Sequence, residues 1–272
     1  MPYRPDSYIA EVLGRPALES FDPGAEEFYC PFVGGACTKR STSLSEPYPV
    51  CSIYKRDMQI CVCPKRFQQV NFLKDVVRHC WPGEKPSRIK AVREVKMKGF
   101  GNVDFVIADM LENGEVDQFL SVELQAIDIT GTVMDAYKAW RAGTELKSKK
   151  SYGLNWSNVY KRYITQLIRK GYFHHHWGTK IVAVMQDAVY EYIKEWADFM
   201  RSSDVKEDKN INIVFMSYKF EEDPNAPGSQ RFVLSEVEGT SHANLQQAVL
   251  YKDAPSRDQF CGHILKAMNR TK

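Results

Sequence analysis

The chain has 272 residues, of which 43% are hydrophobic and 26% charged, so it can bury a full core and is not a disordered or fibrous protein. A formal net charge of +3 excludes a polybasic tail, so any nucleic-acid surface must come from local clusters of basic residues. No apolar run approaches the roughly 20 residues that span a bilayer, and the first residues have no apolar signal core. We therefore expect a cytoplasmic protein.

The composition changes near residue 66. Residues 1–66 are rich in Pro, Gly and Ser, and five of the seven cysteines lie between Cys30 and Cys63. In a chain without an export signal, such crowding indicates a metal site rather than disulfides. We predict a cysteine-rich metal-binding module at 1–66 and a second domain at 67–272.

From residue 67 onward, helices and strands are expected to alternate, which predicts an α/β fold with a mixed sheet flanked by helices. Trp81-Pro82-Gly83 should stop the first helix, Gly171 should cap the end of another, and Asp187 should cap the start of a third. The expected elements are a helix at 67–80, strands at 103–110 and 119–126, helices at 133–146 and 155–169, a strand at 179–186, a helix at 187–200, strands at 211–220 and 231–237, and short helices near Leu245 and Phe260.

The segment from Asn102 to Gln125 is predicted to be a β-hairpin. Asn113-Gly114 between two alternating apolar runs is typical of a two-residue turn, and that turn pairs residues whose numbers add up to 227. Asp104 would then lie opposite Glu123, with Gln125 on the same face and apolar residues on the other.

Two like charges facing each other destabilise a sheet, and a divalent cation between them would remove that cost. Magnesium is held by one or two carboxylates together with phosphate and water, so this pair suits Mg²⁺. The alternative is a pair of solvent-facing acids on an edge hairpin, and a bulge in either strand would break the register. Glu94, before the hairpin, is a candidate accessory ligand or simply a surface charge.

Asp104 followed by Glu123-Leu-Gln125 resembles the signature of PD-(D/E)XK nucleases in its Glu-x-Gln variant, where Gln replaces Lys. With the cysteines upstream, the chain resembles the NotI family of type II restriction endonucleases from about Cys30 to its end. The other stretches that carry this resemblance are Cys30-Pro-Phe with Cys37-Thr-Lys, Cys51-Ser-Ile, Cys63-Pro-Lys-Arg-Phe67, Ile129-Thr-Gly-Thr132 and Asn155-Trp156 before a basic helix ending Lys170-Gly171.

The resemblance implies a restriction-endonuclease-like fold and metal-dependent cleavage of DNA that leaves 5′-phosphates. Asp104 and Glu123 would hold Mg²⁺, and Gln125 would be the third active-site residue. Because Gln is neutral, Gln125 can orient or hydrogen-bond but adds no positive charge. More of the charge stabilisation would then fall on one metal ion or on two.

Four cysteines, Cys30, Cys37, Cys51 and Cys63, are candidate ligands of a structural metal ion. Their gaps are irregular, but four thiolates in a loop-rich segment suit tetrahedral zinc or iron. Cys61 shares a strand face with Cys63 and could replace it; the family pattern favours Cys63, and the resemblance favours iron. Buried free thiols are the alternative, as expected for Cys80 and Cys261.

Basic residues gather in two clusters after the hairpin, where a DNA backbone would have to lie. A run of charges is more often a solvated helix face, so the clusters alone do not establish DNA contact. His174-His175-His176 is predicted to be a loop, since consecutive side chains diverge and chelate poorly. The basic residues are Lys138, Arg141, Lys147, Lys149 and Lys150 in the first cluster, and Lys161, Arg162, Arg169 and Lys170 in the second.

The sequence therefore predicts a type II restriction endonuclease that binds double-stranded DNA as a homodimer, because two-fold symmetric sites suit two-fold symmetric proteins. Two alternatives stay open. One is a repair exonuclease with an iron–sulfur cluster, and the other is a non-catalytic, metal-containing DNA-binding protein. Incubating plasmid DNA with the protein and Mg²⁺ distinguishes them.

Overall fold

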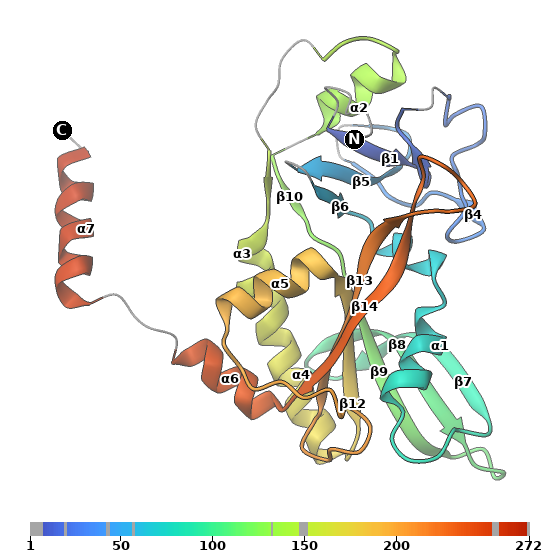
Figure 1. Cartoon of the computed structure of the whole chain (residues 1–272), viewed down its shortest axis with the longest axis vertical. Coiled ribbons are helices and arrows are strands. Elements are labelled where there is room, and N and C mark those ends of the chain that lie inside the picture. Colours follow the sequence, from blue (N-terminus) through green and yellow to red (C-terminus); the bar gives the residue numbers. More distant parts are fainter. Residues whose placement is uncertain are drawn as a thin grey trace.

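A computed structural model describes residues 8–18, 21–41, 44–55, 58–131, 133–146, 152–251 and 256–270 (Figure 1). Its centre is a six-stranded sheet in the order β14-β13-β12-β9-β8-β7. β12 runs parallel to β9 and β13, and the other pairs are antiparallel, so the expected mixed sheet is confirmed. The strands are β7 (Ile89–Met97), β8 (Gly101–Met110), β9 (Val116–Gln125), β12 (Lys180–Gln186), β13 (Ile213–Glu222) and β14 (Gln230–Thr240).

Helices cover both faces of this sheet, as expected (Figure 1). α4 (Thr165–His176) and α5 (Asp187–Trp196) pack on one face, and α1 (Phe72–Cys80) packs on the other. Because side chains alternate along a strand, β12 supplies Ile181 and Ala183 to the α4 and α5 side and Val182 to the α1 side. β12 is buried along its whole length, which explains the apolar run at 181–185 between its two polar ends.

The N-terminal residues form a second, four-stranded sheet in the order β2-β1-β5-β6. Its buried residues Ile9 and Val50 join the same hydrophobic cluster as Ile181 of the central sheet. The division at residue 66 stays a prediction. The strands of this region are β1 (Ile9–Val12), β2 (Arg15–Pro16), β3 (Tyr29–Cys30), β4 (Gly35–Ala36), β5 (Val50–Lys55) and β6 (Met58–Cys61).

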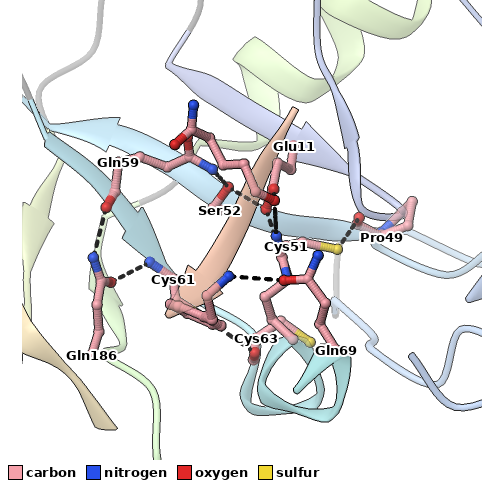
Figure 2. Close-up of polar contacts among 12 residues, drawn as sticks. Glu11, Pro49, Cys51, Ser52, Gln59, Cys61, Cys63, Gln69 and Gln186 are labelled. Atoms are coloured by element: carbon pink, nitrogen blue, oxygen red, sulfur yellow. Dashed lines mark hydrogen bonds and ion pairs between the residues drawn. The ribbon is translucent and has the colours of Figure 1, made fainter. Parts of the chain in front are cut away.

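Polar contacts join the two sheets. Figure 2 shows Gln186, at the end of β12, donating to the carbonyl of Gln59 and accepting from the backbone N–H of Cys61, each at 2.8 Å. Beside them the buried guanidinium of Arg66 binds both carboxylate oxygens of Glu11, at 2.9 and 3.0 Å. A buried charge is tolerated only when paired in this way. Arg66 also donates to the carbonyl of Gln230 in β14 at 2.7 Å, so this pair is connected to the central sheet.

The helices differ from the sequence prediction in detail. The helix expected at 67–80 is a short 3-10 turn, η1 (Pro64–Gln69), followed by α1, which begins where the Asn71 side chain accepts the backbone N–H of Lys74. Helix α2 (Met134–Arg141) is shorter than expected. Asp187 is the first residue of α5 and not its cap, which is Gln186, so that capping prediction was wrong. The remaining elements are β10 (Ile129–Thr130), β11 (Gly153–Leu154), α6 (His242–Leu250) and α7 (Arg257–Arg270).

The helix expected at 155–169 is α3 (Trp156–Asn158), a π-helical segment η2 (Val159–Ile164) and then α4. Gly171 does not cap it: the helix continues to His176, and Gly178, with φ of +64°, follows its end. The loop prediction for His174–His176 was therefore wrong. A Cβ on Gly171 would lie 2.6 Å from Cγ1 of Ile213, so glycine is there for close packing.

No side chain of α7 is buried, and Figure 1 shows this helix standing away from the rest of the protein. Among the described residues, no helix is long and apolar enough to cross a membrane.

Candidate active site and cysteine cluster

The predicted register of the hairpin is correct, but its turn is not. Phe105 pairs with Val122 and Asp109 with Gln118, as the prediction required. The turn is a three-residue loop instead, with Leu111 bonded to Glu115 and Gly114 at φ of +87°. This shifts the register by one residue, and a bulge between Asp109 and Met110 shifts it back.

The registers of β7, β8 and β9 bring three acidic residues into one row. The β8–β9 ladder ends at Phe105 and Val122, and its register, continued by one residue, places Asp104 opposite Glu123. In the β7–β8 ladder Arg93 pairs with Phe105 and Val95 with Val103, so Glu94, between them, lies beside Asp104. Glu94 is exposed and has a φ of +56°. It lies near enough to Asp104 that its charge helps to raise the pKa of the Asp104 carboxyl.

Asp104 and Glu123 are largely withdrawn from solvent. Burial raises the pKa of Asp104, although its carboxylate accepts the backbone N–H of Leu124 at 2.8 Å. Burial also raises the pKa of Glu123 to about 7, and the charge of Asp104 adds to this. Two partly buried carboxylates that disfavour each other's charge form a site that attracts a cation.

A lysine from α4 reaches this pair. The ammonium of Lys170 donates to Oε1 of Glu123 and, at 2.8 Å, to the carbonyl of Asn102. Lys170 is 4% exposed, so it is not part of the exposed basic cluster in which the sequence placed it with Lys161, Arg162 and Arg169. A buried ammonium needs such partners, and Glu123 supplies the opposite charge.

A second contact repeats the first, one helical turn further along. His174 lies four residues after Lys170, and its Nε2 atom lies 2.7 Å from Oγ of Ser121, two residues before Glu123. Four residues of a helix span about 6 Å and two residues of a strand about 6.6 Å. The spacing of Lys170 and His174 along α4 therefore matches that of Glu123 and Ser121 along β9. The His174–Ser121 contact therefore fixes where Lys170 meets β9.

Two further polar groups lie at this site. The buried hydroxyl of Tyr163, in η2, makes no hydrogen bond among the described residues, and burial raises its pKa, with contributions from Glu123 and Asp104. Gln125 is half-buried and donates to the carbonyl of Ala126 at 2.6 Å, so its side chain is bound within its own strand end.

The predicted basic clusters are only partly free. Lys161, Arg162 and Arg169 are exposed on η2 and α4, the elements that carry Tyr163 and Lys170 toward the acids on their other side. Arg141 is engaged by Glu46 and Asp22. Lys138 is exposed, whereas Lys147, Lys149 and Lys150, like Thr132, lie outside the described residues.

The four predicted cysteine ligands are buried, and none of them forms a disulfide. Burial raises the pKa of Cys37, and the neighbouring Cys30 and Cys63 add to the effect. Burial likewise raises that of Cys51, where Cys63 again contributes.

Cys61 differs from these four in its surroundings. It belongs to the hydrophobic cluster on the α1 side and contacts the carbonyl of Cys63 at 3.3 Å (Figure 2). Cys63 thus contributes to the raised pKa of both Cys37 and Cys51, which favours it over Cys61 as the fourth member.

Within the ranges that the structure describes, no three His, Cys, Asp or Glu side chains are arranged to hold a metal ion. The donor chemistry nonetheless fits: paired carboxylate oxygens suit a hard ion such as Mg²⁺, and buried thiols suit zinc or iron. At the acidic pair, the ammonium of Lys170 forms an ion pair with Glu123, so a cation is already bound there.

A protein-family model matches residues 19–234, about four fifths of the chain. The family consists of restriction endonucleases, which are nucleases acting on DNA. The family is described as Restriction endonuclease NotI, and the chain belongs to it. Among curated proteins, none matches the chain.

Sequence reasoning missed the contact between Lys170 and Glu123, although a signal for it exists. The apolar stripe through Tyr163 and Leu167 continues at helical spacing to Lys170 and His174. A lysine on a buried stripe is expected to have an acidic partner, and Glu123 is that partner.

Proposed function

We propose that the chain is a type II restriction endonuclease that cuts both strands of a specific DNA sequence and leaves 5′-phosphates. Mg²⁺ would be held by Asp104 and Glu123. The observation that carries the proposal is the level arrangement of these two partly buried acids on β8 and β9, together with the family match.

Magnesium at such a site activates water and stabilises charge on the scissile phosphate. The protein supplies the two carboxylates, whose positions are fixed by the sheet and by the bond from Leu124 to Asp104. Gln125 would orient the substrate or a water molecule through its amide, since it is neutral and is held beside Ala126. Glu94 is proposed as an accessory ligand at the exposed end of the acidic row.

DNA would lie along the exposed face of η2 and α4. Lys161, Arg162 and Arg169 are exposed on these elements, and the buried Lys170 of α4 contacts Glu123. Contacts to phosphates position the backbone without reading sequence, so these residues would set affinity rather than specificity. Lys138, exposed on α2, is proposed as a separate contact to the DNA backbone.

The cysteine cluster is proposed to hold one structural iron or zinc ion through Cys30, Cys37, Cys51 and Cys63. Its support is the burial of all four thiols and the proximity of Cys63 to Cys37 and Cys51. The module at 1–66 would then be held together partly by metal and partly by the Glu11–Arg66 pair.

The active form is proposed to be a homodimer with one site for each DNA strand. Light scattering of the protein alone and with DNA tests this directly. A strict monomer under both conditions would contradict it.

The function is tested by incubating plasmid DNA with the protein and Mg²⁺, using Glu123→Gln as the matched inactive variant. Discrete fragments whose ends share one sequence are expected from the wild type. Progressive degradation would indicate an exonuclease instead, and DNA binding without any cleavage would indicate a non-catalytic protein.

A further inference from the structure

We propose that Lys170 is the resident cation of the active site and supplies the positive charge that Gln125 lacks. This inference rests on the proposed function, because it assumes that Asp104 and Glu123 form the metal-binding pair. In the metal-free protein Lys170 neutralises Glu123, and in the loaded protein it presents its ammonium to the scissile phosphate.

The position of Lys170 is built into the fold rather than left to a flexible side chain. Its backbone carbonyl accepts a hydrogen bond from Nδ1 of His174 at 2.7 Å, and His174 in turn contacts Ser121 of β9. The next residue, Gly171, brings α4 so close to β13 that a Cβ would overlap Ile213. These contacts set the depth and register at which the ammonium meets Glu123.

The ammonium has capacity for a further acceptor. It carries three N–H donors, and among the described residues two are used, by Glu123 and by the carbonyl of Asn102. When Glu123 turns to a metal ion, Lys170 keeps its 2.8 Å bond to Asn102 and gains free donors. A phosphate oxygen at the acidic pair is the acceptor that its charge would favour.

The same geometry makes Lys170 a competitor of the metal ion. Both cations use the carboxylate of Glu123, so a metal ion must displace the ion pair before it binds fully. Removing the lysine charge should therefore strengthen metal binding while weakening cleavage. A residue that only supports the fold would weaken both.

The test compares Lys170→Met with wild type in two measurements at pH 8.5, where carboxylates are mostly ionised. Calorimetric titration of the DNA-free protein with Ca²⁺ reports the acidic site alone, since thiols bind this hard ion poorly. We expect Ca²⁺ affinity to rise about tenfold. We expect the cleavage rate at saturating Mg²⁺ to fall by roughly a hundredfold.

Three further variants make the result decisive. Lys266→Met, which removes an exposed lysine of α7, should change neither quantity. Lys170→Gln should behave like Lys170→Met and replaces it if that variant unfolds. Lys170→Arg keeps the charge and should hold Ca²⁺ affinity near that of the wild type.

The proposal is overturned if Lys170→Met and Lys170→Gln, both folded, bind Ca²⁺ no more tightly than wild type, or if they cleave at the wild-type rate. Glu123→Gln separates this failure from failure of the proposed function. If Glu123→Gln still cuts DNA, the active site itself is misplaced. If it does not cut, the active site stands and only the role of Lys170 is wrong.

Discussion

His174 lies against Ser121, with its Nε2 atom 2.7 Å from the hydroxyl oxygen, on the face of β9 that carries Glu123. Burial lowers the pKa of His174 from 6.5 to about 4, so the ring is neutral at neutral pH. Its Nδ1 faces the carbonyl of Lys170, which can only accept, so Nδ1 carries the single proton and Nε2 accepts from the hydroxyl of Ser121.

This pKa predicts a loss of stability in acid. Between pH 6.5 and about 4, His174 is protonated in the unfolded chain but neutral in the folded protein. Its contribution to the free energy of unfolding therefore falls as the pH falls through that window. The loss is at most about 3 kcal/mol, because one pKa unit corresponds to about 1.4 kcal/mol.

The measurement is urea unfolding of the wild type and His174→Gln from pH 8 to pH 5. The stability difference between them should shrink as the pH falls. Comparing the two proteins matters because Glu123, whose raised pKa is about 7, changes stability in the opposite direction. Exposed His263, changed to Gln, is the control. A difference that stays constant with pH would contradict the prediction.

Gly171→Ala should destabilise the protein by about 1–3 kcal/mol, because the added methyl group overlaps Ile213 and forces α4 away from β13. Gly262→Ala, in α7, is the matched control, since a Cβ there meets nothing within 4 Å. Thermal unfolding compares the two. If both substitutions have the same effect, the close approach of α4 is not important for stability.

Cys37→Ser should lower metal content and thermal stability together, because the proposed metal ion and the local fold of the module depend on each other. Cys261→Ser, in exposed α7, should change neither. Elemental analysis and a melting curve provide the readout. Well-folded wild-type protein without iron or zinc would show that the thiols are simply buried.

Gln125→Ala should reduce cleavage by only about tenfold, the effect of losing one hydrogen bond that orients a substrate or water molecule. Its amide is already bound to the carbonyl of Ala126, so it is not free to replace a carboxylate at the metal. Single-turnover rates measure the effect. A loss as large as that of Glu123→Gln would mean that Gln125 positions the metal.

The sequence was sufficient to predict the facing acids because alternation and a turn signal define a hairpin locally. It predicted the right register from the wrong turn, since the three-residue loop after Leu111 and the bulge at Asp109 cancel. Neither feature follows from residue preference alone. Gly171 shows the same limit: glycine signals a helix end, but here the requirement comes from Ile213, which is distant in sequence.

The environment of the site also depends on tertiary contacts. On the sequence, Asp104 and Glu123 lie on the polar face of the hairpin, and one alternative was a pair of solvent-facing acids. Instead they are partly buried, and Glu123 holds a buried lysine. Glu123→Gln is therefore a better test than Glu123→Ala, because the amide can still accept a bond from Lys170.

The central claim is that Asp104 and Glu123 form the site of DNA cleavage, and the most direct test compares digestion by wild type, Glu123→Gln and Asp104→Asn in Mg²⁺. The wild type should give discrete fragments with 5′-phosphates. Both variants should give none, although they remain folded and bind DNA in Ca²⁺, since exposed basic residues carry most of that affinity. Cleavage by either variant at the wild-type rate would contradict the claim.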